Sequence, residues 1–318
     1  MQTRCYDVAL TTRFRGITRR SGVLIEGPAG WAEWSPFLEY TRPEIDAWWA
    51  AAVESASQPW PEPVRRTIPV NSIVPAVPAE LAGRYALAGG CRTAKVKVAE
   101  PSQPLAHDLA RVEAVRDALG SDGRVRVDAN CGWSVDAALR AIRALARFDL
   151  EYVEQPCASV EELAELRRGL AQAGIDVPIA ADESIRRSGD PDRVVALAAA
   201  DIAVLKVQPL GGVRACLELA DRLGLPVVVS SALESSVGIA AGVALAAALP
   251  DLPYACGLNT LALLESDVTN DPLVVRDGQL EVRRVAPSGA EWRAGAELTD
   301  WWQRRRREVE TRAEGERG

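Results

Sequence analysis

Six ionisable residues in the middle of the sequence could together carry out proton-transfer chemistry. Each lies in a short segment with strand character, and they are Lys95, Lys97, Asp128, Glu154, Asp182 and Lys206. Carboxylate oxygens are ligands that suit Mg²⁺ or Mn²⁺ and not zinc. A desolvated lysine beside other cations shifts towards its neutral form, which is a general base. The set predicts a divalent metal site whose lysines could remove the α-proton of a metal-bound carboxylate substrate.

The single histidine and the scattered cysteines disfavour several other kinds of active site. His107 lies in PLAHDLARVEAV, a segment with a helical pattern, and we expect it on the helix surface. A Ser-His-Asp triad, a Cys-His pair or a multi-histidine metal site would need a well-placed histidine. The six cysteines form no CxxC pair, so they favour reduced thiols in a cytoplasmic protein over disulfides or a zinc site.

Composition and charge indicate a large globular protein and disfavour two classes of partner. The chain has 318 residues, of which 48% are hydrophobic, and this is enough for a large core. Its formal net charge of −7 disfavours nucleic acid and anionic membranes as partners. The longest apolar run, at 237–250, is short for a transmembrane span and predicts a packed helix. The sequence leaves the oligomeric state open.

The elements that must position the six residues form a regular series of strands and helices. Strand candidates lie at 69–74, 93–98, 124–130, 151–156, 178–184, 201–209 and 226–232, with a weak one at 254–258. Amphipathic helical segments fill most of the intervals. Eight such units predict a (β/α)8-type barrel, in which the carboxyl ends of the strands carry the chemistry. A doubly wound sheet is the alternative, but the chain lacks a glycine-rich phosphate loop.

Both ends of the chain depart from this repeat. The amino-terminal elements expected are strands at 3–9, 22–27 and 30–34 and a helix at 41–56. A proline-rich connector at 58–69 is a plausible domain boundary. Near the other end, 273–285 suggests a hairpin around Asp277-Gly278. The four arginines at 304–307 are followed by interleaved acidic residues, and this favours a solvated helix over a nucleic-acid patch.

Five segments, in order and at matching spacing, resemble the enolase superfamily in its muconate-lactonizing-enzyme-like group. They are TAKVKV, RVDANCGW, YVEQP, AADES and VLKVQPLGG. The resemblance extends over nearly the whole chain. It implies an α/β fold with a small α+β capping domain at 1–62, a (β/α)7β barrel at 63–262 and a tail at 263–318 that returns to the capping domain.

The same resemblance implies roles for individual residues. The expected Mg²⁺ ligands, with Mn²⁺ as a possible substitute, are Asp128, Glu154 and Asp182. Lys97 is the second lysine of the K-x-K motif, Lys95 is the first, and Lys206 lies across the site. Asn130 and Glu183 are expected to support the metal ligands.

Within this group the chain is similar to the o-succinylbenzoate synthase family. A short capping domain and the segments 14–37 and 230–268 carry the similarity. The resemblance implies syn-dehydration of 2-succinyl-6-hydroxy-2,4-cyclohexadiene-1-carboxylate to o-succinylbenzoate in menaquinone biosynthesis. Lys97 would remove the α-proton and deliver it to the departing hydroxyl. Lys206 would stay cationic and stabilise the enediolate, partly through a cation–π contact.

Other functions on the same scaffold stay open. N-succinylamino acid racemases share the site closely, and muconate cycloisomerases remain possible. Dipeptide epimerases carry a D-x-D pair after the last barrel strand, which CGLNTLALLESD lacks. Mandelate-racemase-like chemistry needs a histidine on a late strand. A non-catalytic binding protein would usually have lost a catalytic group, whereas all six are present.

The expected substrate contacts follow from the two carboxylates of that substrate. Four serines, Ser230, Ser231, Ser235 and Ser236, flank the end of the seventh strand, where the next helix begins and could help to bind an anion. Helix capping is an alternative role for these hydroxyls. Arg19 is one of four arginines in TTRFRGITRRSG that could meet the substrate, and solvent exposure is the alternative for each of them.

Overall fold

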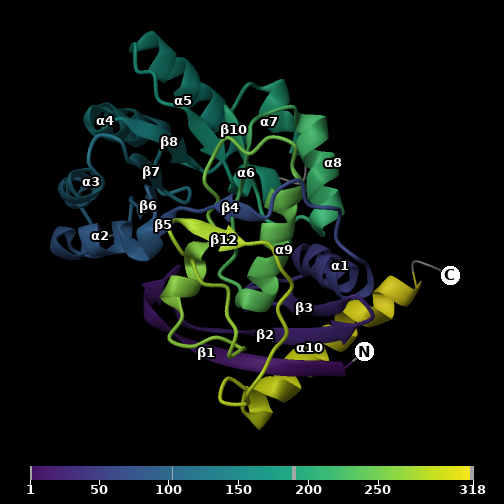
Figure 1. Cartoon of the computed structure of the whole chain (residues 1–318). Coiled ribbons are helices and arrows are strands. Elements are labelled where there is room, and N and C mark those ends of the chain that lie inside the picture. The colour runs from purple at the N-terminus through teal and green to yellow at the C-terminus, as the bar shows by residue number, and fades with distance from the viewer. Residues whose placement is uncertain (1, 102, 188–190, 316–318) are drawn as a thin grey trace.

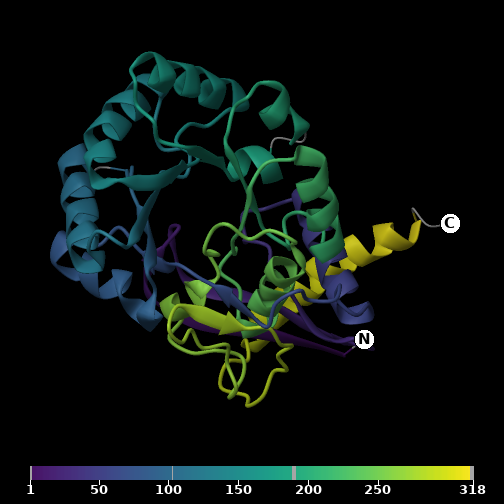
Figure 2. The same cartoon turned by 45° about the horizontal axis from the view of Figure 1, so that its top comes forward.

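The computed structural model describes residues 2–101, 103–187 and 191–315, and a curled parallel sheet forms its centre (Figures 1 and 2). Its seven strands follow one another in sequence order. They are β5 (Ser72–Val74), β6 (Thr93–Lys97), β7 (Arg124–Asp128), β8 (Leu150–Glu154), β9 (Ile179–Ala181), β10 (Ile202–Leu205) and β11 (Val227–Val229). Parallel bridges from Cys256 to Val70 and from Gly257 to Ser230 close the ring. The weak eighth strand is therefore a two-residue closure, in agreement with the expected (β/α)7β barrel.

Helices surround this barrel on its outside (Figure 2). They are α2 (Ala79–Ala86), α3 (Leu105–Leu119), α4 (Val135–Leu145), α5 (Val160–Gln172), α7 (Asp192–Ala196), α8 (Val213–Leu223) and α9 (Ser236–Ala248). The one-turn helix α6 (Glu183–Arg186) lies instead at the carboxyl end of β9. Short 3₁₀ helices are η1 (Ala88–Gly90), η2 (Ala146–Phe148) and η3 (Asn259–Leu263). The apolar run predicted to pack is α9, whose residues from Ser236 to Ala247 are all buried. No helix of the described residues is long and apolar enough to cross a membrane.

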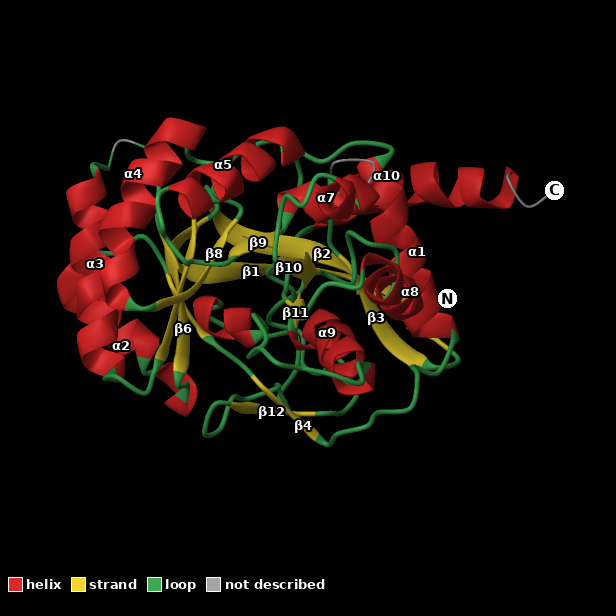
Figure 3. Ribbon diagram, turned by 90° about the horizontal axis from the view of Figure 1, so that it is seen from above, coloured by secondary structure: helices red, strands yellow, loops and turns green. Residues whose placement is uncertain are grey.

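A second folded part combines both ends of the chain and lies beside the barrel (Figures 1 and 3). It contains an antiparallel sheet, β1 (Gln2–Phe14), β2 (Ile17–Gly27) and β3 (Gly30–Trp34), with the helices α1 (Glu44–Ser57) and α10 (Ala296–Gly315). Trp302 of α10 is fully buried against Trp34, with ring centroids 5.4 Å apart. In the linking region β4 (Thr67–Pro69) pairs with β12 (Gln279–Glu281). The tail thus packs on the amino-terminal sheet, while the proposed boundaries after residues 62 and 262 stay predictions.

One arginine of the run 304–307 departs from the expectation of a solvated helix. Arg305 is buried and its guanidinium donates to the carbonyl oxygens of Phe37 (3.1 Å) and Tyr40. The helical pattern of α10 places this position on the same face as Trp302, so its side chain turns towards the protein. Arg305 therefore holds the loop that follows β3.

A buried polar network joins the amino-terminal sheet to the carboxyl end of the barrel. The guanidinium of Arg20, on β2, donates to the carbonyl oxygens of Leu233 (2.9 Å) and Ala232 (3.3 Å) in the loop after β11. The carboxylate of Glu234 accepts from the backbone N–H of Ala232 (2.6 Å). Burial, and secondarily the charge of Glu33, raises the pKa of Glu234 to about 7, against the opposing charge of Arg20. The network fixes the loop, and burial favours the protonated form of Glu234.

This network predicts a specific pH dependence of stability. The folded pKa of Glu234 is about 7 and its reference value is 4.5, so the native state holds a proton that the unfolded state releases. The contribution of Glu234 to stability is therefore fully present below about pH 4.5 and falls by about 3 kcal/mol as the pH rises to 7. We expect Glu234→Gln to lack this part of the fall, as measured by urea denaturation from pH 4.5 to 8. The exposed Glu62→Gln serves as the control and should follow the parent protein, and equal slopes for all three proteins would contradict the prediction.

Candidate active site

The register of the barrel strands brings the predicted catalytic residues to one level. Lys97 pairs in register with Asp128, and Asp128 pairs with Glu154, so the carboxyl ends of β6, β7 and β8 are aligned. Asp182 directly follows β9, and Lys206 directly follows β10. Lys95 lies two residues before Lys97 on β6 and therefore shares its face. All six expected residues thus meet at the carboxyl end of the barrel.

Each of the three carboxylates is paired with a lysine. The pairs and their N–O distances are Lys95–Glu154 at 2.7 Å, Lys97–Asp128 at 3.0 Å and Lys206–Asp182 at 2.6 Å. The carboxylates are buried, and the side chain of Lys97 is the most accessible of the lysines at 15%. Buried charges need such partners, because an unpaired one would cost several kcal/mol.

These pairs set the protonation of the site. Burial, assisted by the charges of Asp128 and Asp182, raises the pKa of Glu154 to about 7 against the opposing charge of Lys95. Burial would also raise the pKa of Asp182, but the charges of Arg186 and Lys206 outweigh it and hold that pKa well below its usual range. Burial favours the neutral amine of Lys95, yet the charges of Glu154 and Asp128 outweigh burial and raise its pKa. Lys95 is therefore a cation in this arrangement.

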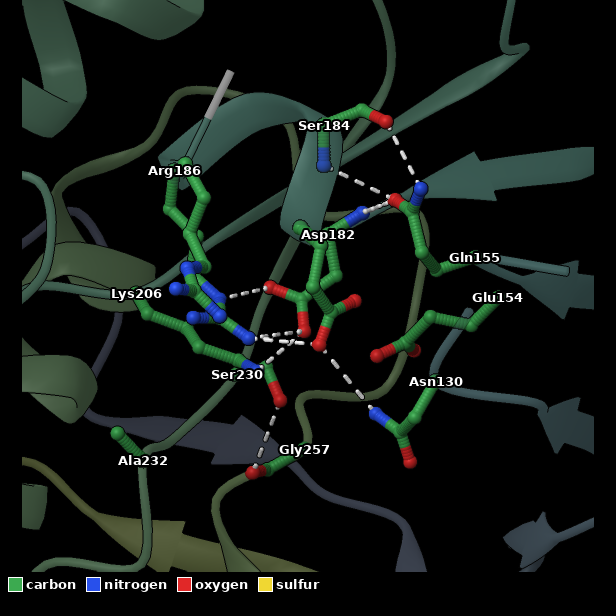
Figure 4. Close-up of polar contacts among 12 residues, drawn as sticks. Asn130, Glu154, Gln155, Asp182, Ser184, Arg186, Lys206, Ser230, Ala232 and Gly257 are labelled. Carbon is green, nitrogen blue, oxygen red and sulfur yellow. Dashed lines mark hydrogen bonds and ion pairs between the residues drawn. The ribbon is translucent and has the colours of Figure 1, made fainter. Parts of the chain in front are cut away.

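Arg186 is a site residue that the sequence interpretation missed. It lies on α6, one helical turn after Asp182, and its Nε donates to Asp182 Oδ1 at 2.8 Å. Its Nη2 donates to Glu183 Oε1 at 2.7 Å. Figure 4 shows Arg186 and Lys206 converging on Asp182. The i,i+4 and i,i+3 spacings from the two acidic residues are the signal that could have revealed it.

Asn130 and Gln155 support the acidic residues from the loops after β7 and β8. The backbone N–H of Asn130 donates to Asp128 Oδ1 at 3.0 Å, and its amide lies 3.5 Å from Glu183 Oε1. Gln155 was not singled out from the sequence, although it follows Glu154 directly. Its Oε1 accepts from the backbone N–H of Asp182 at 2.9 Å, which fixes the start of α6 (Figure 4).

The donor chemistry of the site fits a hard divalent cation. Asp128, Glu154 and Asp182 offer only carboxylate oxygens, the ligand type that Mg²⁺ and Mn²⁺ prefer. Glu183 Oε2 is buried and has no hydrogen-bond partner among the described residues. Within the same residues, no three acidic, histidine or cysteine side chains converge closely enough to hold an ion, because the carboxylates turn towards lysines and Arg186. Metal ligation by these carboxylates therefore stays a prediction.

A pocket with an empty volume of about 580 Å³, open mouth included, lies over these residues. Its lining includes the three lysines with Asp128 from the barrel, and Phe14, Arg15 and Phe37 from the amino-terminal sheet and the loop after it. Two of the expected substrate contacts, Ser230 and Ser231, also line it. Ser231 Oγ lies 2.9 Å from Gly257 O and 2.9 Å from Thr260 Oγ1.

The other three expected substrate contacts do not line this pocket. Ser235 caps α9 and its hydroxyl donates to Glu33, as the capping alternative predicted. The hydroxyl of Ser236 donates to Asp267. Arg19 is exposed and pairs with Asp7 at 2.9 Å. The positions of these three residues give no support to a role in substrate binding. The position of Arg19 matches the alternative of solvent exposure.

Comparisons with known proteins agree with this geometry. Residues 5–56 match the enolase N-terminal domain-like family, and residues 78–294 match the enolase C-terminal domain-like family. The o-succinylbenzoate synthase of Thermobifida fusca is 64% identical over 285 residues, which cover 90% of this chain and 88% of that protein. The o-succinylbenzoate synthase of Mycolicibacterium smegmatis is 54% identical, with 94% and 92% covered.

Solved structures agree on the fold. The muconate lactonizing enzyme of Pseudomonas fluorescens superposes with a TM-score of 0.76 at 23% identity, over 92% of this chain and 98% of that one. At this identity the likeness extends to the fold alone, and it confirms the expected capped barrel. Together with the curated relatives, it shows that the chain belongs to the enolase superfamily and, within it, to the o-succinylbenzoate synthase family.

Proposed function

We propose that the protein catalyses the syn-dehydration of 2-succinyl-6-hydroxy-2,4-cyclohexadiene-1-carboxylate to o-succinylbenzoate, a step of menaquinone biosynthesis. The observation that carries the proposal is the convergence of three lysines and three carboxylates on one pocket, in a chain 64% identical to a synthase of this name. The six unpaired cysteines are consistent with the reducing cytoplasm as its location.

Asp128, Glu154 and Asp182 are the residues that would hold Mg²⁺, with Mn²⁺ as a substitute. When bound, the ion would supply positive charge beside the substrate carboxylate, where negative charge develops as the α-proton leaves. Asn130, Gln155 and Glu183 would keep these carboxylates in place, since they contact the acidic side chains or the start of α6.

Lys97 is the proposed general base. Lys97 lines the pocket and its side chain is the most accessible of the three lysines, so it can reach a bound α-carbon. In a syn elimination the C–H and C–O bonds break on one face, so one amine can take the proton and return it to the departing hydroxyl as water. Lys97 has to be neutral when it accepts the proton, as a general base requires.

Lys206 and Lys95 have different proposed roles. Lys206 pairs with Asp182 and is the proposed cation that stabilises the negative charge developing on the substrate. Lys95 is buried, contacts both Glu154 and Asp128, and balances their charges at the base of the pocket. N-succinylamino acid racemisation is the second candidate, because a pair of lysines at the pocket could exchange an α-proton on a succinylated substrate.

Substitutions of Lys97 and Lys206 should distinguish the role of a general base from that of a permanent cation. We expect Lys97→Ala to lower kcat by about 10²- to 10⁴-fold, because no other group would take the α-proton. Lys97→Arg should be equally impaired, since a guanidinium stays charged at neutral pH. Lys206→Arg should retain more activity than Lys206→Ala, since its role requires charge only. The measurement is the absorbance change of the cyclohexadiene substrate with Mg²⁺.

If the Lys97→Arg variant were about as active as the parent protein, Lys97 could not be the general base. Absence of turnover in the parent protein, combined with α-proton exchange of N-succinyl amino acids in D₂O, would favour the racemase instead.

Metal binding can be tested without turnover, because the chain contains only three lysines and all three line the pocket. In protein labelled with [¹⁵N]lysine, every side-chain signal therefore reports on this site. Adding Mg²⁺ should shift these signals reversibly, because the carboxylates would exchange ammonium partners for the ion, and EDTA should restore them. Asp182→Asn should bind Mg²⁺ more weakly. Signals that stay unchanged at millimolar Mg²⁺ would contradict the assigned ligands.

A further inference from the structure

The tip of the β1–β2 hairpin contributes to the same pocket as the lysines. Arg15 and Gly16 form the turn between the strands, with φ of 50° and 79°. The ring of Phe14, just before this turn, lies 5.4 Å from Lys97 Nζ. Phe14 and Arg15 both line the pocket. The hairpin therefore brings a guanidinium close to the proposed base without placing it among the metal-ligand candidates.

The guanidinium of Arg15 is held in place, and no carboxylate of the described residues pairs with it. It stacks on the ring of Phe37, 4.0 Å from the centroid, and its Nη2 donates to the hydroxyl of Tyr40 at 2.5 Å. Arg305 of α10 donates to the backbone carbonyls of Phe37 and Tyr40, so this aromatic surface is anchored from behind. Most of the five N–H donors of Arg15 remain available to a ligand.

Arg15 differs in this respect from the other cationic side chains of the pocket. Those four are paired with carboxylates at 3.0 Å or less: Lys95, Lys97, Lys206 and Arg186. Over the ranges 2–101, 103–187 and 191–315, no carboxylate forms an ion pair with Arg15. The pocket thus has a balanced charge at the barrel end and an unbalanced positive charge at the hairpin end.

We propose that Arg15 binds the terminal carboxylate of the succinyl arm of the substrate. The inference rests on the proposed function, whose substrate has one carboxylate at the reacting carbon and a second at the end of a flexible arm. The first belongs at the barrel end, where the proton is removed, so the second must find a cation elsewhere in the pocket. A guanidinium matches a carboxylate with two parallel hydrogen bonds, and the stack on Phe37 fixes its plane.

The neighbouring arginines of the hairpin are placed for other tasks. Arg19 pairs with Asp7, and Arg20 is buried in the network that holds the loop after β11. Arg13 is exposed and does not line the pocket. Of the four arginines between residues 11 and 22, Arg15 is thus the one that the hairpin presents to a ligand.

Substitution of Arg15 should weaken recognition of one functional group. We expect Arg15→Gln to raise KM about 10- to 100-fold, the effect of losing a charged hydrogen-bond pair, with a smaller change in kcat. Its affinity for o-succinylbenzoate, measured by calorimetry with Mg²⁺, should fall by a similar factor. An analogue with a carboxamide in place of the terminal carboxylate should bind equally to Arg15→Gln and to the parent protein. Arg13→Gln, with the same change two residues earlier, is the matched control and should resemble the parent protein.

Tyr40→Phe tests whether Arg15 acts only by ordering the aromatic surface. This variant loses the hydroxyl partner of Arg15 but keeps the guanidinium, so it should still prefer the carboxylate over the carboxamide. Equal loss of affinity for acid and carboxamide in Arg15→Gln, or no loss for either, would overturn the proposal. Binding does not require turnover, so a protein that fails to dehydrate the substrate would refute the proposed function while the calorimetry still decides the role of Arg15.

Discussion

Charge balance at the carboxyl end of the barrel is the constraint on which the site depends. Three buried carboxylates stand on neighbouring strand ends, and their mutual repulsion would be prohibitive without cations at the same level. The barrel supplies these cations from β6 and from the end of β10, one lysine for each carboxylate. The alternating TAKVKV strand, which directs two lysines into the interior, is therefore the counterpart of the acidic residues on β7 and β8.

The balance of charges depends on the positions of the strands that carry the charged residues. Strands of three to five residues carry the groups, and a shift of one residue would turn each side chain to the opposite face. The second folded part restrains the pocket from the other side through Arg20, whose guanidinium holds the loop after β11, and through Arg305, which holds the loop after β3. Both parts must therefore be docked for the pocket to keep its shape.

The sequence predicts a site residue well when its position follows from the strand that carries it, and poorly when its position depends on contacts with distant segments. The six charged residues could be found because strand ends of a parallel barrel meet at one edge, whichever helices lie between. The sequence could not show which of the four serines line the pocket and which cap a helix, because Ser231 and Ser235 differ only in their place relative to the start of α9. Arg15 and Arg19 likewise differ only in their distance from the hairpin turn. The protonation of Lys95 depends on which charges are nearest, and spacing along the sequence does not show that these are the carboxylates of Glu154 and Asp128.

Lysine and arginine have different roles in this chain. It has 37 lysines and arginines together, of which only three are lysines, and all three line the pocket. A guanidinium keeps its charge in any protein environment and is suited to permanent contacts, such as those of Arg20 and Arg305 with backbone carbonyls. An ammonium can lose its proton, and proton transfer at Lys97 requires this. By the same reasoning Arg15 cannot serve as a base, and an arginine that lines the pocket without a carboxylate partner among the described residues is suited to hold an anion.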